Sequence, residues 1–354
     1  MRVFVTGPSP LLLIGQGRIS SYIWNFSKDA HADCTGCFFG LPADQVQGRM
    51  LPLTRGASAA VNFGALCETA KPDLVISVGS DSDASHVAAT LAVGMAEFKW
   101  VHILVDEPRW KRRPYESIID ADLVVAVGEN AAKQADDSGC RRLVQVHPFS
   151  PISAVSPKTY REKQKYFVCT QRNLETSNLE YLKIEWEKSG LADEGWEMVL
   201  ATNGADPGEY DMGLHRLPAG FRLQYHASSL SYGVSDAEWM GFVGSSWGLV
   251  DVGLCSACGV SESEAAALDV GSIVSTETPW GGHCCLLQAT KFLSSSGQIL
   301  HIPLEGELSR VLRNSVESPL VPSPPKCSKN ISEIMPDIFG HLDRKIELTC
   351  VTPS

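Results

Sequence analysis

The sequence predicts an α/β protein of two tandem Rossmann-like domains, each a doubly wound parallel sheet, that face each other across a cleft. Short apolar segments alternate with amphipathic ones from the first residues to beyond residue 300, a pattern typical of βαβ units. Prolines near residue 150 separate two such series. The 354 residues are too many for one compact core and suit two domains of roughly 150 residues each.

In the first series, apolar runs predict strands and periodic apolar residues predict helices. The apolar residues within 19–26 recur at helical spacing, and the run Asp73–Val78 is typical of a strand buried on both faces. Gly139 is expected to end a helix in the left-handed conformation. The predicted strands are 2–6, 37–39, 73–78, 100–105, 123–127 and 144–146, and the predicted helices are 19–26, 59–70, 86–97, 116–121 and 130–138.

Pro148, Pro151 and Pro157 indicate a linker, after which the alternation resumes. The predicted strands are 166–169, 196–201, 221–225, 249–254, 271–275 and 298–302, and the predicted helices are 179–186, 236–243, one around residue 264, 283–293 and 305–313. A proline-rich segment at 321–326 precedes a last amphipathic stretch at 331–342. We therefore expect domains at 1–150 and 151–320, followed by a connector and trailing helix at 321–354 that packs back on the first domain.

Charge and hydrophobicity limit the partners and the location that we expect for this protein. With 41 acidic and 30 basic residues the net charge is −11, which disfavours nucleic acid and anionic membranes as general partners. The apolar runs are shorter than the ~20 residues that span a bilayer, and the first residues do not resemble a signal peptide, so we expect a cytoplasmic protein. The single dense basic run, Arg109–Arg113, is either a solvated loop or a contact to an acidic acceptor.

The eleven cysteines are expected to be reduced and mostly buried. Two Cys-x-x-Cys pairs, Cys34/Cys37 and Cys255/Cys258, have the spacing of two zinc ligands. They are far apart in sequence and each adjoins a predicted strand. We therefore predict no metal site.

Two stretches resemble GT-B glycosyltransferases, the large group that includes glycogen and sucrose synthases. Residues 116–129 are similar to the family's helix that ends in Ala-Asp and leads into a strand ending in a small residue and Glu. Residues 254–275 resemble its donor-site signature, in which a Gly-aliphatic pair precedes a helix opening on Glu-Ala, then a glycine and an apolar strand. The resemblance spans most of the chain and implies the two-domain fold predicted above.

The resemblance also implies a nucleotide site. Glu264 matches the acid that holds the nucleotide ribose, and a carboxylate is suited to accept two hydroxyl hydrogen bonds. Gly259, Val260 and Ser261 lead into that helix. Ser261-x-x-Glu264 is equally a capping box, so both interpretations stay open. The family's second acid, near the donor sugar, is replaced by Ser256, with Glu262 or Asp251 as substitutes.

Four further residues are candidates for contact with the phosphates. Gly15 and Gly17 resemble a glycine loop that lets backbone N–H groups approach a phosphate, with Arg18 as a further contact. Arg172 matches the basic residue that neutralises the leaving diphosphate. The lysine that usually follows is absent from residues 175–178, and a solvated loop arginine is the alternative.

Acidic residues follow two predicted strands of the first domain: Asp81 and Asp83 after one, Asp106 and Glu107 after the next. An inverting transfer needs a base for the acceptor proton, and Asp83 or Asp106 would serve, whereas a retaining transfer in this family needs none. Asp106 matches the Asp of a family His-Asp pair, although Val105 replaces the His. Asp81 could instead cap the following helix.

We therefore predict a metal-independent hexosyl- or pentosyltransferase that needs no cofactor beyond its nucleotide-diphosphate sugar, such as a UDP-sugar. The acceptor is a hydroxyl of a glycan, lipid, small molecule or modified DNA base. The alternatives are a non-hydrolysing nucleotide-sugar epimerase and a non-catalytic nucleotide-binding protein on the same fold.

Overall fold

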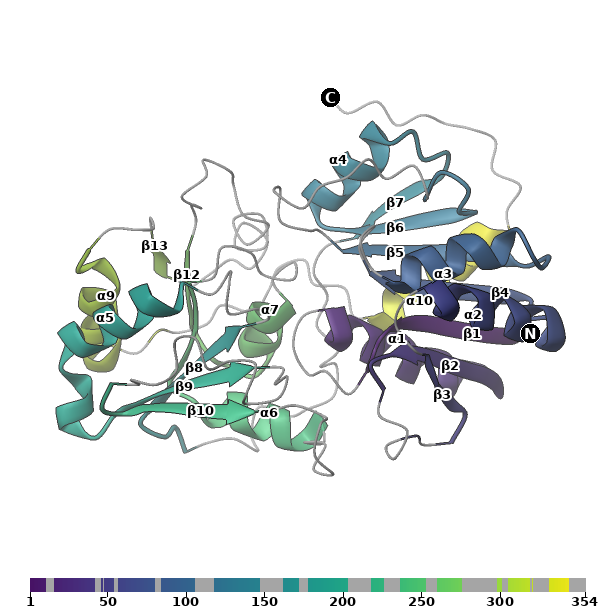
Figure 1. The fold of residues 1–354 in the computed structure, drawn as a ribbon. Helices are drawn as coiled ribbons and strands as arrows, with labels where there is room; N and C mark the ends of the chain where they lie inside the picture. Colours follow the sequence, from purple (N-terminus) through teal and green to yellow (C-terminus); the bar gives the residue numbers. More distant parts are fainter. Residues whose placement is uncertain are drawn as a thin grey trace.

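The computed structural model describes residues 1–10, 16–41, 46, 48–53, 57–79, 84–105, 118–146, 162–171, 178–202, 218–225, 236–252, 260–275, 298–300, 305–318, 320 and 331–343. Two parallel sheets organise these residues, and the elements around each sheet form two units that lie side by side (Figure 1).

The first sheet has seven parallel strands in the order β3-β2-β1-β4-β5-β6-β7. The chain starts in the middle, adds two strands on one side, and returns to place β4 beside β1, which creates a switch point at the carboxyl ends of these two strands. The strands are β1 (Arg2–Pro8), β2 (Asp33–Phe39), β3 (Met50–Leu53), β4 (Leu74–Gly79), β5 (Lys99–Val105), β6 (Leu123–Val127) and β7 (Leu143–Val146).

Helices cover both faces of this sheet, because successive side chains of a strand point to opposite faces. Val3 and Val5 belong to the core beneath α1 (Gln16–Ala30) and α10 (Ile331–Asp343). Phe4 belongs to the core beneath α2 (Ala57–Ala70), α3 (Ala84–Val93) and α4 (Glu129–Asp137). Although α10 is the last helix of the described residues, it lies among the first unit's elements (yellow in Figure 1) and contributes Met335 and Ile338 to that unit's core.

The second sheet has six parallel strands in the order β10-β9-β8-β11-β12-β13. They are β8 (Tyr166–Gln171), β9 (Glu197–Thr202), β10 (Phe221–Tyr225), β11 (Gly248–Asp251), β12 (Ser272–Ser275) and β13 (Gln298–Leu300). One face packs on α5 (Leu179–Ser189) and α9 (Glu307–Glu317), and the other on α6 (Asp236–Ser245) and α7 (Val260–Ala267). A short 3-10 helix, η6 (Leu191–Glu194), follows α5.

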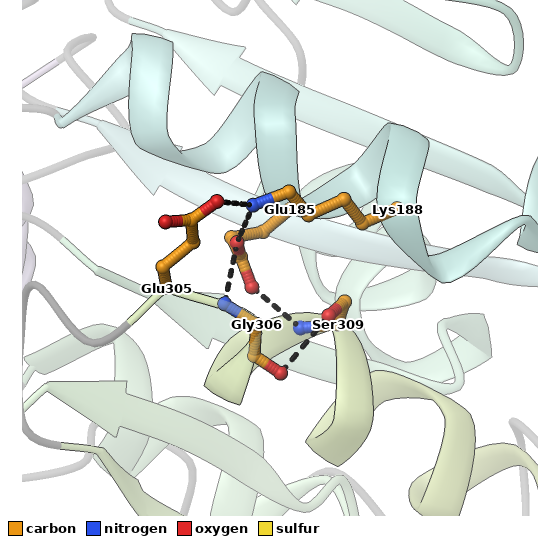
Figure 2. Close-up of polar contacts among 5 residues, drawn as sticks. All are labelled: Glu185, Lys188, Glu305, Gly306 and Ser309. Carbon is orange, nitrogen blue, oxygen red and sulfur yellow. Dashed lines mark hydrogen bonds and ion pairs between the residues drawn. The ribbon is translucent and has the colours of Figure 1, made fainter.

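A carboxylate from α5 closes the N-terminus of α9 (Figure 2). Glu185 accepts hydrogen bonds from the backbone N–H groups of Gly306, at 2.9 Å, and Ser309, at 3.1 Å. Lys188 pairs with Glu185 at 3.3 Å and with Glu305 at 2.6 Å. Two N–H groups that α9 cannot satisfy within its own first turn are thus bonded, and the carboxylate faces the positive end of the helix dipole.

The fold class and most of the predicted elements are confirmed. Gly139 ends α4 with φ 79°. The sequence prediction misses β3 and extends α3 too far: the helix ends at Val93 rather than at residue 97, because a turn forms in which Met95 and Ala96 both donate to the carbonyl of Ala92. The predicted helix 283–293 and the first two residues of the predicted helix 116–121 lie outside the described residues. Residues 118–121 form a turn rather than an α-helix, in which the N–H of Ala121 donates to the carbonyl of Ile118 at 3.1 Å.

Candidate functional site

The short helix α7 sits where the two units meet. In the sequence it connects β11 to β12, two strands that pair in parallel in the second sheet. Its first residue, Val260, is buried in the apolar core that belongs to the first unit. Ala265, one turn further on, is buried in the core of the second unit. The start of α7 therefore touches the first unit while its remainder stays anchored on its own sheet.

Glu264 lies on the buried side of α7 and takes hydrogen bonds from both units. Nε–H of Arg18 donates to Oε1 of Glu264 at 2.6 Å, and the hydroxyl of Tyr22 donates to the same oxygen. Nε1–H of Trp239, from α6, donates to Oε2 at 3.1 Å. Arg18 and Tyr22 come from α1, so two of these three donors cross from the first unit to the second.

The cluster of Glu264 with Arg18, Tyr22 and Trp239 is shielded from solvent. The Arg18 and Glu264 side chains are each 1% exposed. The guanidinium carbon of Arg18 lies 4.6 Å from the ring centroid of Tyr22, a distance suited to a cation–π contact. Burial raises the pKa of the Glu264 carboxyl, and the Arg18 guanidinium partly opposes that rise. The pair is a desolvated ion pair in which each charge depends on the other.

The capping-box interpretation of Ser261 and Glu264 does not hold in this structure. That motif needs Ser261 as the residue before the helix, whereas α7 begins at Val260 and places Ser261 in its first turn. The carboxylate of Glu264 accepts from the three side chains above rather than from the backbone at the helix start.

The other predicted nucleotide-binding residues divide into two groups. Gly17 is buried in the first turn of α1, next to Arg18, so Gly17, Arg18, Val260 and Glu264 come together at one junction. Five predicted site residues lie outside the described residues: Gly15, Asp83, Asp106, Arg172 and Gly259. Ser256, which replaces the family's second acid, lies outside them too. Arg18, considered above as a phosphate contact, is directed to Glu264 in this structure.

The two acids named as substitutes for the missing sugar-binding acid are both buried. Asp251 is the last residue of β11, and Glu262 lies in the first turn of α7. Both therefore belong to the segments that flank residues 253–259, which include Ser256. Their placement keeps both acids as candidates for that role.

The Cys34/Cys37 pair does not form a metal site. Both residues lie in β2, but Cys34 belongs to the core beneath α1 and Cys37 to the core beneath α2 and α3. Two thiols on opposite faces of a sheet cannot bind one ion. Across the described part of the chain, no group of three potential metal ligands gathers, and no helix has the length and apolar character of a membrane span. Cys255 and Cys258 lie outside that part.

Sequence reasoning missed that Arg18, Tyr22 and Trp239 are the partners of Glu264. One available signal was the spacing of Arg18 and Tyr22, because residues four apart lie on the same face of a helix. A buried arginine on such a face needs a buried acid. Nothing in the sequence pointed to Trp239, whose indole N–H reaches Glu264 from α6.

Each unit has a parallel sheet with the strand order of a Rossmann fold, and α1 of the first unit contacts α6 and α7 of the second. Two such units in tandem make up the GT-B fold. Neither a protein-family profile nor a curated protein matches the sequence. Solved structures match over nearly the whole chain. Sucrose-phosphate synthase from Thermosynechococcus elongatus is 14% identical with a TM-score of 0.64, covering 97% of this chain and 99% of that one.

Two further structures extend the comparison. A UDP-GlcNAc 2-epimerase from Methanocaldococcus jannaschii, in complex with UDP-GlcNAc and UDP, is 12% identical with a TM-score of 0.59, covering 96% of this chain and 100% of that one. A glycosyltransferase from Rickettsia africae is 12% identical with a TM-score of 0.56, covering 96% and 94%. Because identities are this low, the likenesses establish the fold, which glycosyltransferases and nucleotide-sugar epimerases share.

Proposed function

We propose that the protein is a glycosyltransferase that moves a sugar from a nucleotide-diphosphate sugar to an acceptor hydroxyl. One observation carries this proposal: on a GT-B fold, the carboxylate of Glu264 stands on α7 at the junction of the two units. Ligands of open α/β sheets bind beyond the carboxyl ends of the strands, and α7 follows the carboxyl end of β11. An acid at that position is suited to hold ribose hydroxyls.

In this proposal each unit has its own substrate. The second unit, residues 151–320, binds the nucleotide sugar through Glu264, Arg172 and the backbone of Gly259, Val260 and Ser261. The first unit, residues 1–150, binds the acceptor and contributes Gly15 and Gly17 near the phosphates. Residues 321–354 form a connector and trailing helix, consistent with the packing of α10 on the first unit. Transfer then requires the donor sugar and the acceptor to meet at the junction of the two units.

The chemistry follows from these roles. The bond between C1 of the sugar and the diphosphate oxygen breaks, and the acceptor oxygen forms a new bond to C1. The acceptor proton passes to Asp83 or Asp106 in an inverting transfer, or to the departing phosphate in a retaining one. The guanidinium of Arg172 neutralises the charge that develops on the diphosphate, so the reaction relies on protein groups rather than on a metal.

A binding panel tests the proposal. Full-length protein is titrated with UDP, GDP, ADP and their sugars while its melting temperature is followed, because a ligand of the native state raises it. We expect one nucleotide, with UDP the first choice given the solved UDP complexes, to raise the melting temperature. Glu264→Gln should reduce that rise, whereas Glu305→Gln, whose side chain is 87% exposed, should leave it unchanged. No response to any nucleotide would refute the proposal.

The epimerase is a second candidate, because epimerases are among the solved structures with this fold. The two activities separate by product analysis. An epimerase converts its nucleotide sugar without any acceptor, whereas a glycosyltransferase releases nucleoside diphosphate in proportion to the acceptor supplied. Binding without either product would indicate a nucleotide-binding protein without catalytic activity.

A further inference from the structure

Donors from the first unit already occupy Oε1 of Glu264. Oε1 accepts from Nε–H of Arg18 and from the hydroxyl of Tyr22. A carboxylate oxygen offers about two lone-pair sites, so these two donors fill Oε1. Trp239 takes one site on Oε2. With 1% of the Glu264 side chain exposed, no ribose reaches this carboxylate while Arg18 and Tyr22 stay in place.

We propose that Arg18 and Tyr22 form a latch that competes with the nucleotide for Glu264. The latch rests on the proposed function, since it assumes that the ribose binds Glu264. Its two donors, one N–H and one O–H, are equal in number to the two hydroxyls of a ribose. The exchange replaces two hydrogen bonds to the carboxylate with two others, and the bond from Trp239 belongs to the same unit as Glu264 and is unaffected.

The latch also holds the two units together. Arg18 and Tyr22 belong to α1 of the first unit, whereas Glu264, Trp239 and Met240 belong to the second. One Arg18 terminal nitrogen lies 4.0 Å from Sδ of Met240. Val260, at the start of α7, is buried in the first unit's core. Withdrawal of α1 from Glu264 therefore separates the units along this junction, and Glu264 and Val260 become accessible together.

Nucleotide binding and the latch are linked as two states of one equilibrium. A ligand shifts such an equilibrium only by its differential affinity for the two states, and the measured dissociation constant is the intrinsic one divided by the fraction of open molecules. Arg18 and Tyr22 thus lower the apparent affinity for nucleotide in proportion to the stability of the latch. Weakening the latch tightens nucleotide binding, the opposite of what loss of a ligand-contacting residue does.

Tyr22→Phe is the main test, because it removes one donor and keeps the ring that packs against Arg18. We expect this variant to bind its nucleotide about three- to tenfold more tightly in isothermal titration calorimetry, through the larger open fraction. Arg18→Gln should have a larger effect. Lys28→Gln, on the exposed side of α1, is the matched control and should bind like the wild type. Pyrophosphate, which has no ribose, should bind the wild type, Tyr22→Phe and Lys28→Gln equally.

Small-angle scattering tests the latch without any ligand. Tyr22→Phe and Arg18→Gln should each increase the radius of gyration relative to wild type and Lys28→Gln. The latch would be overturned by unchanged radii of gyration in both variants, or by nucleotide binding that is unchanged or weaker in Tyr22→Phe. Arg18 and Tyr22 would then be structural contacts that do not compete with the nucleotide. Failure of every nucleotide to bind any of the four proteins would instead refute the proposed function. If Arg18→Gln does not fold, Tyr22→Phe carries both measurements.

Discussion

His86 and His102 are hydrogen-bonded to each other inside the first unit, with Nδ1 of His86 3.0 Å from Nε2 of His102. Nδ1 of His102 lies 2.7 Å from the hydroxyl of Ser77, which also accepts from Nε1–H of Trp100 at 2.7 Å. Both imidazoles are buried, and burial lowers both pKa values, that of His86 to about 4. This chain of side chains is therefore a neutral network within the core.

The neutral histidine pair predicts acid sensitivity near pH 5. In the unfolded chain both rings have pKa values near 6.5, whereas in the folded protein they stay neutral to lower pH. Titration of these two rings therefore does not change the free energy of unfolding above pH 6.5. The free energy of unfolding decreases as the pH falls from 6.5 toward about 4, because the histidines of the unfolded chain take up protons before those of the folded protein. The loss for His86 should be on the order of a few kcal/mol.

Urea unfolding between pH 7.5 and 4.5 measures this effect. His86→Gln should be less stable than wild type at pH 7.5, but its stability should fall less steeply with pH because one titrating ring is gone. His31→Gln, at a partly exposed position, should follow the wild-type curve more closely. Parallel curves for wild type and His86→Gln would contradict the prediction.

The carboxylate cap on α9 predicts a second stability effect. Glu185→Gln keeps the shape of the side chain but loses the charge and one of two acceptor oxygens, so one backbone N–H at the start of α9 loses its partner. Charged hydrogen bonds of this kind contribute about 1.5–3 kcal/mol. Glu305→Gln, at an 87% exposed position beside the same lysine, should not change stability measurably. Equal urea midpoints for the two variants would show that the cap contributes nothing.

Sequence patterns predicted the buried strands well, because a strand covered on both faces is a continuous apolar run that needs no partner for recognition. β4, six buried residues, is the clearest case. β3 escaped prediction because it is an edge strand of four residues that contains Pro52 and has an exposed Leu51. Proline is tolerated at a sheet edge, where one side of the strand needs no hydrogen bonds, so Pro52 is compatible with β3.

The partners of the site were less predictable than its central acid. Glu264 could be singled out from its position before an apolar strand. Arg18 is 246 residues away in sequence, and local periodicity does not reveal which helices of two separate units face each other. The helical spacing of α1 indicates an inward face, and Tyr22 does lie in the apolar core beneath that helix. That spacing does not show that the Tyr22 hydroxyl also donates to an ion pair between the units.

The buried thiols predict low reactivity in the folded protein. Burial raises the pKa of Cys34 and Cys67 to about 12 and that of Cys37 further. Because the thiolate is the reactive form, N-ethylmaleimide at pH 7.5 should leave these three unmodified in native protein and label them in urea. Cys140, only partly buried and with a pKa raised to about 11, should react sooner. Rapid native labelling of Cys34 or Cys37, measured by peptide mass spectrometry, would contradict their burial in β2.

Gly220 and Gly195 form a matched pair that separates backbone strain from crowding. Both have positive φ, 70° and 78°, so alanine at either position should cost about 1–2 kcal/mol of strain. A Cβ on Gly195 meets nothing within 4 Å, whereas one on Gly220 would lie 2.7 Å from the carbonyl oxygen of Trp196 and 3.0 Å from Cβ of Ala192.

Gly220→Ala should therefore lose roughly 1–3 kcal/mol more than Gly195→Ala, because the backbone at Trp196 must shift to admit the methyl group. Both glycines belong to the second unit and flank β9 and β10, so urea midpoints of the same transition compare them directly. Equal losses would mean that the chain before β10 moves away from Trp196 at little cost, and that the close approach at Gly220 does not constrain this side of the second sheet.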